Sequence, residues 1–188
     1  KGSSALKYGG EAVGGVIYFK DNPFVISEVI SGYIGSKFNN SNLLFGNQIG
    51  LKWSKNKFYF NLHAQYSLAT DYRLPNNTYL FNSRYRNKAI KFSIASRQEK
   101  LQNIFRYQYN GDEVGIPAHT HKDLEEVNID NITNNSIDVS EDFKVTRPTQ
   151  FIDNHLFIYE NAYFLNKSKL SFQLGHFMNN LKEYEKWT

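Results

Sequence analysis

The sequence between Leu43 and Leu68 alternates apolar and polar side chains over two consecutive stretches, and this pattern constrains the fold more than any other feature. The apolar set is Leu43, Phe45, Ile49, Leu51 and Trp53, then, after the polar link 54–57, Phe58, Phe60, Leu62, Ala64, Tyr66 and Leu68. The polar set is Gln48, Lys52, Tyr59, Asn61, His63, Gln65 and Ser67. Because side chains alternate faces along a strand, the pattern predicts a two-stranded ribbon with one apolar and one polar face. Each strand is about eleven residues long, roughly twice the usual length, which is typical of a transmembrane β-barrel.

Composition separates two kinds of membrane-spanning structure. Hydrophobic residues make up 40% of the 188 residues, the mean hydropathy is −0.56, and no long apolar run occurs. A transmembrane helix is therefore excluded. A β-barrel is not excluded, because half of each strand faces a polar interior. The 16% aromatic content suits the aromatic girdles of a membrane barrel and equally an aromatic-rich soluble sheet.

Several other classes of protein find no support in the sequence. The chain has no Cys, which rules out disulfides and thiolate metal sites. The formal charge is only +4, and basic residues are spread among acidic ones, so we expect no nucleic-acid partner. The motifs Gly-x-Ser-x-Gly and His-Glu-x-x-His are missing, so we expect no enzyme. The chain begins at Lys1 without a signal peptide and stops after a strand, and we expect an internal piece of a longer protein.

Alternation and turn residues predict seven strands along the chain. Their expected ranges are 28–36, 43–53, 58–68, 87–96, 101–110, 155–165 and 169–179. No segment has convincing helical periodicity. The expected fold class is therefore all-β.

The links between these strands differ in length in a regular way. In chain order they span 37–42, 54–57, 69–86, 96–100, 111–154 and 166–168, so that medium or long links alternate with short ones. Consecutive links of an up-and-down barrel lie at opposite ends, which would collect the short links at one end. Outer-membrane barrels have this asymmetry, with short periplasmic turns and long extracellular loops. A link as long as 111–154 also argues against a compact soluble domain.

Glycines punctuate the beginning of the chain. The pairs Gly9-Gly10 and Gly14-Gly15 separate short apolar pieces, which indicates tight turns before a strand at 16–19. Their spacing fits neither a dinucleotide-binding glycine loop nor a P-loop. The stretch resembles the end of the plug domain of TonB-dependent outer-membrane receptors, where a Lys/Arg-Gly-Pro/Ser-x-x-x-x-Tyr-Gly segment precedes a Gly-Gly-Val-Ile strand. The matching residues are Lys1, Gly2, Ser3, Leu6, Tyr8, Gly9, Gly14, Gly15, Val16 and Ile17.

The resemblance implies a fold and a function for the whole chain. Residues 1–20 would be the C-terminal end of the plug, and residues 21–188 the N-terminal strands of the barrel, with a long extracellular loop at about 111–154. The expected fold is a partial antiparallel up-and-down transmembrane β-barrel, about seven of the 22 strands of that family. It would lie in the lipid of the bacterial outer membrane. The resemblance further implies active uptake of a scarce solute, driven by a TonB-type energy-coupling protein that binds a segment absent from this chain.

The sharpest polar constellation falls in the longest link. It consists of two His and three carboxylates, namely His119, His121, Asp123, Glu125 and Glu126. Imidazole nitrogens and carboxylate oxygens suit Zn²⁺ and similar metals, whereas a solvated loop is the plainer interpretation. The run 115–121 also resembles a Gly-Leu/Ile-Pro-Ala/Gly-His-Ser/Thr-His stretch of TonB-dependent zinc receptors, without the Cys and further His that follow there. The implied cargo is zinc, another metal ion or an iron chelate, and no resident cofactor is expected.

Other polar residues are weaker candidates. His63 falls on the polar face of the ribbon, where it would line a substrate path or simply form one of many hydrogen bonds. His155 opens an expected strand, and His176 shares a face with apolar residues, which would place it at a membrane interface. A basic cluster is expected at the outer rim, where it would attract anions or be solvated. That cluster is Arg84, Arg86 and Lys88.

Two other functions remain open from the sequence: a passive or adhesive outer-membrane barrel, and a soluble β-sandwich or lipocalin-like ligand-binding module. In a soluble protein the apolar face would pack into an interior. In a membrane barrel it would point outward from a curved sheet, with the polar face on the concave side. The diagnostic residues are Leu51, Phe60, Leu62, Ile94 and Phe172 on the apolar face, and Asn61, His63 and Gln65 on the polar face.

Overall fold

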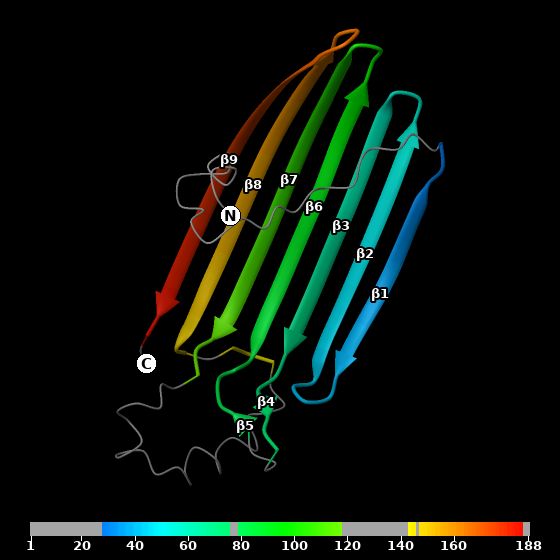
Figure 1. Ribbon diagram of the computed structural model, residues 1–188. Coiled ribbons are helices and arrows are strands. Elements are labelled where there is room, and N and C mark those ends of the chain that lie inside the picture. The colour runs from blue at the N-terminus through cyan, green and yellow to red at the C-terminus, as the bar shows by residue number, and fades with distance from the viewer. Residues whose placement is uncertain (1–27, 76–78, 118–142, 146, 186–188) are drawn as a thin grey trace.

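The computed structural model describes residues 28–75, 79–117, 143–145 and 147–185. Within these residues seven strands form one antiparallel sheet, and two short strands form a separate hairpin (Figure 1). The sheet strands are β1 (Ser31–Asn39), β2 (Leu44–Lys55), β3 (Phe58–Ala69), β6 (Tyr85–Arg97), β7 (Leu101–Gly115), β8 (Thr149–Phe164) and β9 (Lys169–Tyr184). The hairpin strands are β4 (Tyr72–Arg73) and β5 (Tyr79–Leu80). Helices of membrane-spanning length and hydropathy do not occur in this part of the chain. The predicted all-β antiparallel fold class is confirmed.

The seven strands follow one another across the sheet in chain order. Every neighbouring pair in the order β1-β2-β3-β6-β7-β8-β9 is antiparallel. The links 56–57, 98–100 and 165–168 therefore lie at one end of the sheet, the turn end. The links 40–43, 70–84 and 116–148 leave and rejoin the sheet at the other, the loop end (Figure 1). Among the described residues the sheet is open, because β1 and β9 each pair on one side only.

Three strands extend well beyond their predicted boundaries. β7 continues to Gly115, β8 already begins at Thr149, and β9 ends only at Tyr184, so the longest link shrinks from 111–154 to 116–148. Backbone pairing continues there between residues such as Asp112 and Ile152. Polar side chains occupy both faces in these extensions, and alternation of polarity cannot reveal such a strand.

Two of the predicted links are also corrected. The first link is 40–43 rather than 37–42, which makes it no longer than 165–168. The contrast between long and short links therefore rests on 70–84 and 116–148 alone. Leu43, expected on the apolar face, lies in the first link with a φ of 44°. The long link predicted at 69–86 contains the β4–β5 hairpin.

The ribbon formed by β2 and β3 follows the predicted pattern closely. Backbone pairing runs from Phe45 with Leu68 to Lys55 with Phe58, which leaves a two-residue turn. Asn56 in this turn has a φ of 54°, the left-handed conformation that tight hairpin turns need and that Asn tolerates.

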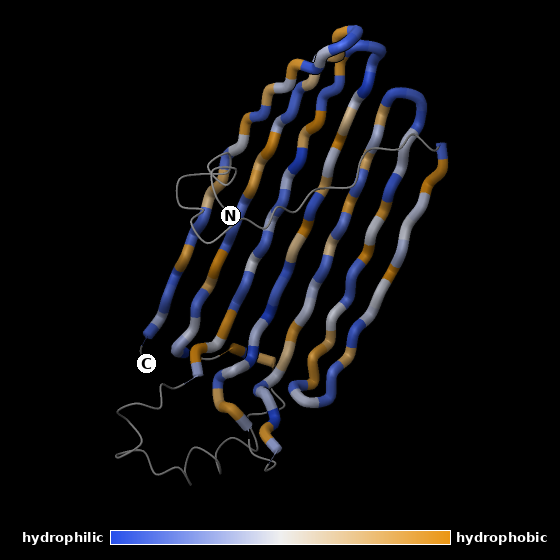
Figure 2. The backbone as a smooth tube through the Cα atoms, in the orientation of Figure 1, coloured by the Kyte–Doolittle hydropathy of each residue, from blue (hydrophilic) through white to orange (hydrophobic). Residues whose placement is uncertain are grey.

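The register carries one apolar face across the whole sheet. One row of directly paired residues on successive strands is Leu51, Leu62, Phe92, Tyr107 and Phe157. Figure 2 shows hydrophobic and hydrophilic positions alternating along the strands. Large side chains of this face stay exposed, such as Ile94 at 48% and Phe172 at 58%. Each sheet strand makes its substantial contacts with its sheet neighbours only, so the described residues supply no second layer. The packed interior of a soluble sandwich is not formed in this part of the chain.

The opposite, polar face is the more enclosed of the two. Buried residues on it are Ser54, Ser93, Ala95, Ile104 and Arg106. The guanidinium of Arg106 pairs with the Glu160 carboxylate at 2.5 Å. Asn61, His63 and Gln65 belong to this face, as predicted. The side chains that can meet a polar ligand are therefore on this face and at the loop end.

Candidate functional site

Most of the residues predicted to be functional lie outside the described residues. These are the candidate metal ligands and carboxylates His119, His121, Asp123, Glu125 and Glu126, and the plug-motif residues Gly2, Tyr8, Gly9, Gly14 and Gly15. Within the ranges that the structure describes, no group of three or more His, Cys, Asp or Glu side chains is arranged to hold a metal ion. The metal-loop hypothesis therefore stays a prediction.

His63 lies on the polar face of β3, as the alternation predicts. Its Nδ1 lies 2.7 Å from the Tyr33 hydroxyl, two strands away. Gly50 makes this contact possible, because it sits on the strand between them and a Cβ there would overlap the Tyr33 ring. The His63 imidazole is therefore held in place by β1. Once the register of the three strands is known, Gly50 lies between Tyr33 and His63 across the sheet, and the missing side chain is the one sequence feature that points to this pair.

The two other described histidines lie on the apolar face. His155 is in the interior of β8 rather than at its start, because that strand begins earlier than predicted. Its Nδ1 lies 2.9 Å from the Tyr107 hydroxyl. His176 shares the apolar face with Leu174, as predicted, and its ring lies 6.4 Å from that of Phe157. Neither histidine is placed to act together with His63.

A ladder of amide side chains crosses the polar face near the loop end. The Gln65 Nε2 donates to the Asn87 Oδ1 at 3.1 Å. The Asn87 Nδ2 in turn donates to the Asp112 Oδ1 at 2.6 Å, and the Asn110 Nδ2 donates to the other carboxylate oxygen at 2.5 Å. These bonds link β3, β6 and β7. They fix the orientation of side chains that would otherwise rotate freely.

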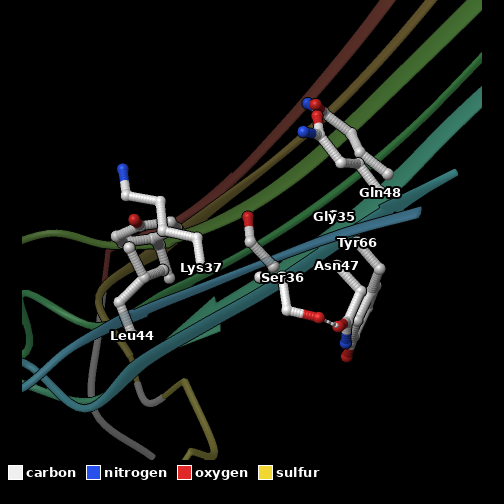
Figure 3. A pocket seen from close by; sticks show the side chains of 11 residues that line it. Gly35, Ser36, Lys37, Leu44, Asn47, Gln48 and Tyr66 are labelled. Carbon is white, nitrogen blue, oxygen red and sulfur yellow. Dashed lines mark hydrogen bonds between the residues drawn. The ribbon is translucent and has the colours of Figure 1, made fainter. Parts of the chain in front are cut away.

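The ladder ends at a cavity of about 250 Å³ over β1, β2 and β3. Its lining on the polar face comprises Gly35, Lys37, Leu44, Gly46, Gln48, Gln65, Ser67 and Tyr85. Figure 3 shows Lys37 and Gln48 rising on the same side of the strands, with Gly35 between them. On the other side of the strands, the Ser36 hydroxyl donates to the Asn47 Oδ1 at 2.8 Å (Figure 3). The polar-face lining offers one ammonium group, two amides and two hydroxyls, and none of its described residues carries a carboxylate.

The loop end also contains a buried ion pair that corrects the predicted basic rim. Arg84 and Asp71 pair directly, and both side chains are fully buried. The Arg84 Nη1 also donates to the Lys144 carbonyl oxygen at 3.0 Å, which ties the β5–β6 connection to the end of the 116–148 link. Arg84 is therefore a structural anchor rather than a solvated rim charge. A buried ion pair between residues of one irregular link leaves no periodic signal in the sequence.

Asn82 strengthens the same anchor. Its Nδ2 donates to the carbonyl oxygens of Ile116 and Pro148, at 3.0 and 2.7 Å. These two residues are the first and last of the longest link, and they are called its feet. Gly115 packs so closely that a Cβ there would overlap the Asn82 backbone oxygen. The Gly115 amide donates to the Arg84 carbonyl oxygen at 2.9 Å. The described feet of this link are therefore held by residues of the 70–84 link, and the name loop clamp is used below for Asp71, Asn82 and Arg84.

Arg86 and Lys88, the other two residues of the predicted basic cluster, lie on the apolar face at the loop end. Arg86 pairs with Glu113 at 3.1 Å. The Lys88 ammonium lies 5.6 Å from the centre of the Tyr109 ring, and the hydroxyl of that tyrosine donates to the Asp153 carboxylate at 2.6 Å. These two basic side chains are thus partnered by acidic and aromatic groups of β7 and β8. They form a mixed-charge rim.

No known protein-family model matches the chain, and no curated protein matches it. The polar face and the loop end together hold the amide ladder, the cavity and the loop clamp, whereas the turn end consists of links of two to four residues. An arrangement of this kind can bind a polar solute beside the sheet.

Proposed function

We propose that this chain forms part of the wall of a TonB-dependent outer-membrane transporter that takes up a metal ion or a metal chelate. One observation carries the proposal: a single-layered, up-and-down sheet has one exposed apolar face and one enclosed polar face. In water, an apolar face of this width would be an unusually large exposed patch. Against lipid it is the favourable side, with the polar face turned to the barrel interior.

The height of the apolar face supports a membrane position. On β9 the apolar-face residues from Leu170 to Met178 are followed by Asn180 and Lys182. Eight steps of about 3.4 Å span roughly 27 Å along the strand. A tilt of 35–45° reduces this to about 20 Å along the membrane normal, close to the apolar band of about 25 Å that surrounds outer-membrane barrels.

The open edges support a larger assembly. β1 and β9 each leave one row of backbone N–H and C=O groups without a strand partner among the described residues. Hydrocarbon does not tolerate unpaired backbone groups, so a membrane wall of this kind requires further strands to close it. Two parts of the proposal rest on resemblance to TonB-dependent receptors. The plug and the energy-coupling protein are inferred from the resemblance at residues 1–19, and the metal cargo is inferred from the resemblance at residues 115–121.

The membrane position is tested by labelling adjacent positions that face opposite sides. The chain has no Cys, so single-Cys variants carry no background. Leu62→Cys with His63→Cys, and Leu174→Cys with Gln173→Cys, form two matched pairs across the sheet. In the native membrane we expect the leucine positions to react with a lipid-soluble maleimide only, and their neighbours with a water-soluble one. Leucine positions closed to both reagents, or open to the water-soluble one, would instead indicate a soluble module.

Transport is tested separately, in cells with and without the energy-coupling protein. Uptake of radioactive Zn²⁺ or a ferric chelate that depends on the coupling protein supports an active transporter, and equal uptake without it indicates a passive barrel. Calorimetry with Zn²⁺ on the protein and on a His119→Ala/His121→Ala variant tests the metal loop. Unchanged affinity in the double variant removes that part of the proposal.

A further inference from the structure

We propose that the cavity over β1, β2 and β3 is a binding subsite for a small organic anion that carries carboxylate and hydroxyl groups, either free or as a metal chelate. This inference rests on the proposed function, because it names the class of solute that the wall would meet. It goes beyond that function because it places a solute-binding subsite on named residues of the wall. The residues that would carry it are Lys37, Gln48, Gln65 and Ser67, with Gly35 and Gly46 as the floor.

The two glycines of the floor are not explained by backbone conformation. Neither Gly35 nor Gly46 has a left-handed φ, so an L side chain is conformationally acceptable at both positions. In the register Gly35 pairs with Gln48 and Gly46 with Lys37, so the glycines lie diagonally within one block of four residues. Each polar side chain therefore stands beside a position without a side chain. The result is a hollow whose floor is backbone and whose walls are polar.

The charge of the cavity selects an anion. Among the described residues, Lys37 is the only ionised group of the lining, and no Asp or Glu contributes to it. The nearest acidic group in the same row across the sheet is Asp112, whose oxygens already accept from Asn87 and Asn110. An ammonium group without a lining carboxylate attracts a ligand carboxylate, and a charge-assisted hydrogen bond of this kind is stronger than a neutral one.

The neutral groups select hydroxyls on the same ligand. Amides and hydroxyls both donate and accept hydrogen bonds, which matches the two roles of a ligand hydroxyl group. Gln65 is held by its bond to Asn87, so its amide is fixed before a ligand arrives. Fixed groups lose little side-chain entropy on binding, which favours affinity. A cavity of about 250 Å³ is below the usual range for drug-sized ligands, and it suits a metabolite-sized anion.

Two substitutions separate the charge from the shape of the cavity. Lys37→Gln removes the cation and keeps a polar side chain. Gly46→Val fills the hollow, and its Cβ would lie 3.4 Å from the Ser67 Cβ, an ordinary contact that the strand accommodates. The matched controls are Lys52→Gln on the same face of β2 and Gly175→Val on β9, where a Cβ would meet only the Phe157 oxygen at 3.8 Å.

The measurement is titration calorimetry on the full-length protein, with citrate alone and with citrate bearing one equivalent of Fe³⁺ or Zn²⁺. We expect Lys37→Gln to weaken binding by about 10- to 100-fold, as the loss of a charged hydrogen bond does. We expect Gly46→Val to abolish binding, and both controls to stay within about twofold, as for surface substitutions. Equal affinity for free and chelated citrate would show that the subsite recognises the carboxylate groups themselves. Binding of the chelate only would identify the metal complex as the ligand.

Two results would overturn the inference: no binding of either citrate form to the unsubstituted protein, or binding that survives Gly46→Val. A failure of the subsite is distinguishable from a failure of the proposed function, because the cysteine-labelling pattern at Leu62 and His63 does not depend on any ligand. The His119→Ala/His121→Ala variant provides a further control. It should leave citrate binding unchanged, since the described lining of the cavity comes from β1, β2, β3 and Tyr85 of β6.

Discussion

Removing Arg84 should open the loop clamp, and the structure allows the cost to be worked out. The Arg84–Asp71 pair is fully buried, so Arg84→Met would leave a carboxylate in a site without its guanidinium partner. Breaking a buried ion pair from one side typically costs about 3–5 kcal/mol. Asp71 would keep the backbone N–H bonds of Ser83 and residue 84, at 2.9 and 3.2 Å, which moves the expected cost to the lower half of that range.

The cost should appear as local opening at the feet of the longest link. The amides of Gly115 and Ile116 donate to Arg84 and Pro148 respectively, so their hydrogen exchange reports on the clamp. Since about 1.4 kcal/mol is a factor of ten, a cost near 3 kcal/mol predicts exchange roughly a hundredfold faster at these amides. Amides in the β2–β3 ribbon should be unchanged, because they are held by the backbone pairing between β2 and β3.

Two further variants decide whether burial of the charge is the cause. Arg86→Met removes a neighbouring arginine whose pair with Glu113 is 39% and 24% exposed, so about 0–1 kcal/mol is expected. Asp71→Asn combined with Arg84→Met removes the stranded charge and keeps an acceptor for Ser83, and it should recover most of the loss. The reasoning is refuted if Arg84→Met accelerates exchange no more than Arg86→Met, or if the double variant is worse than the single one.

Three sets of substitutions test local features of the sheet by equilibrium unfolding or NMR. Asn56→Gly should leave stability within a few tenths of a kcal/mol, whereas Asn56→Val should cost about 1–2 kcal/mol, because a β-branched residue resists the φ of 54°. Gly50→Ala should displace the Tyr33 ring and break its hydrogen bond to His63. The ¹⁵N chemical shifts of the His63 imidazole report this loss. Leu62→Lys on the apolar face should cost about 2–4 kcal/mol in a membrane, and Asn61→Lys on the polar face close to none.

The ribbon of β2 and β3 was predictable because its local signals agree. Apolar and polar residues alternate there with few exceptions, and a polar link separates the two strands. The position of His63 on the polar face follows from that alternation alone. The same reasoning placed His176 beside Leu174 on the apolar face.

The features near the loop end could not be predicted because they depend on distant residues. β7 continues past Asn110 and β8 begins before His155 because their backbones pair there, although polar side chains occur on both faces of this part of the sheet. Arg84 looked like a rim charge, since its buried partner and the Lys144 carbonyl are brought to it only by the fold. The amide ladder likewise joins residues of three strands. Periodicity reports which face a residue takes, and it carries no information on which side chain stands opposite.

The choice of an ion pair for the loop clamp is itself informative. A buried pair adds little net stability compared with apolar packing of similar volume, since desolvation of both charges offsets their attraction. Its advantage is geometric. The Arg84 guanidinium satisfies Asp71 in one link and the Lys144 carbonyl in another only when both stand in one relative position. Apolar side chains would tolerate sliding between the two links. We therefore expect the clamp to define where the longest link leaves the sheet, and the double variant Asp71→Asn/Arg84→Met to keep stability while relaxing that position.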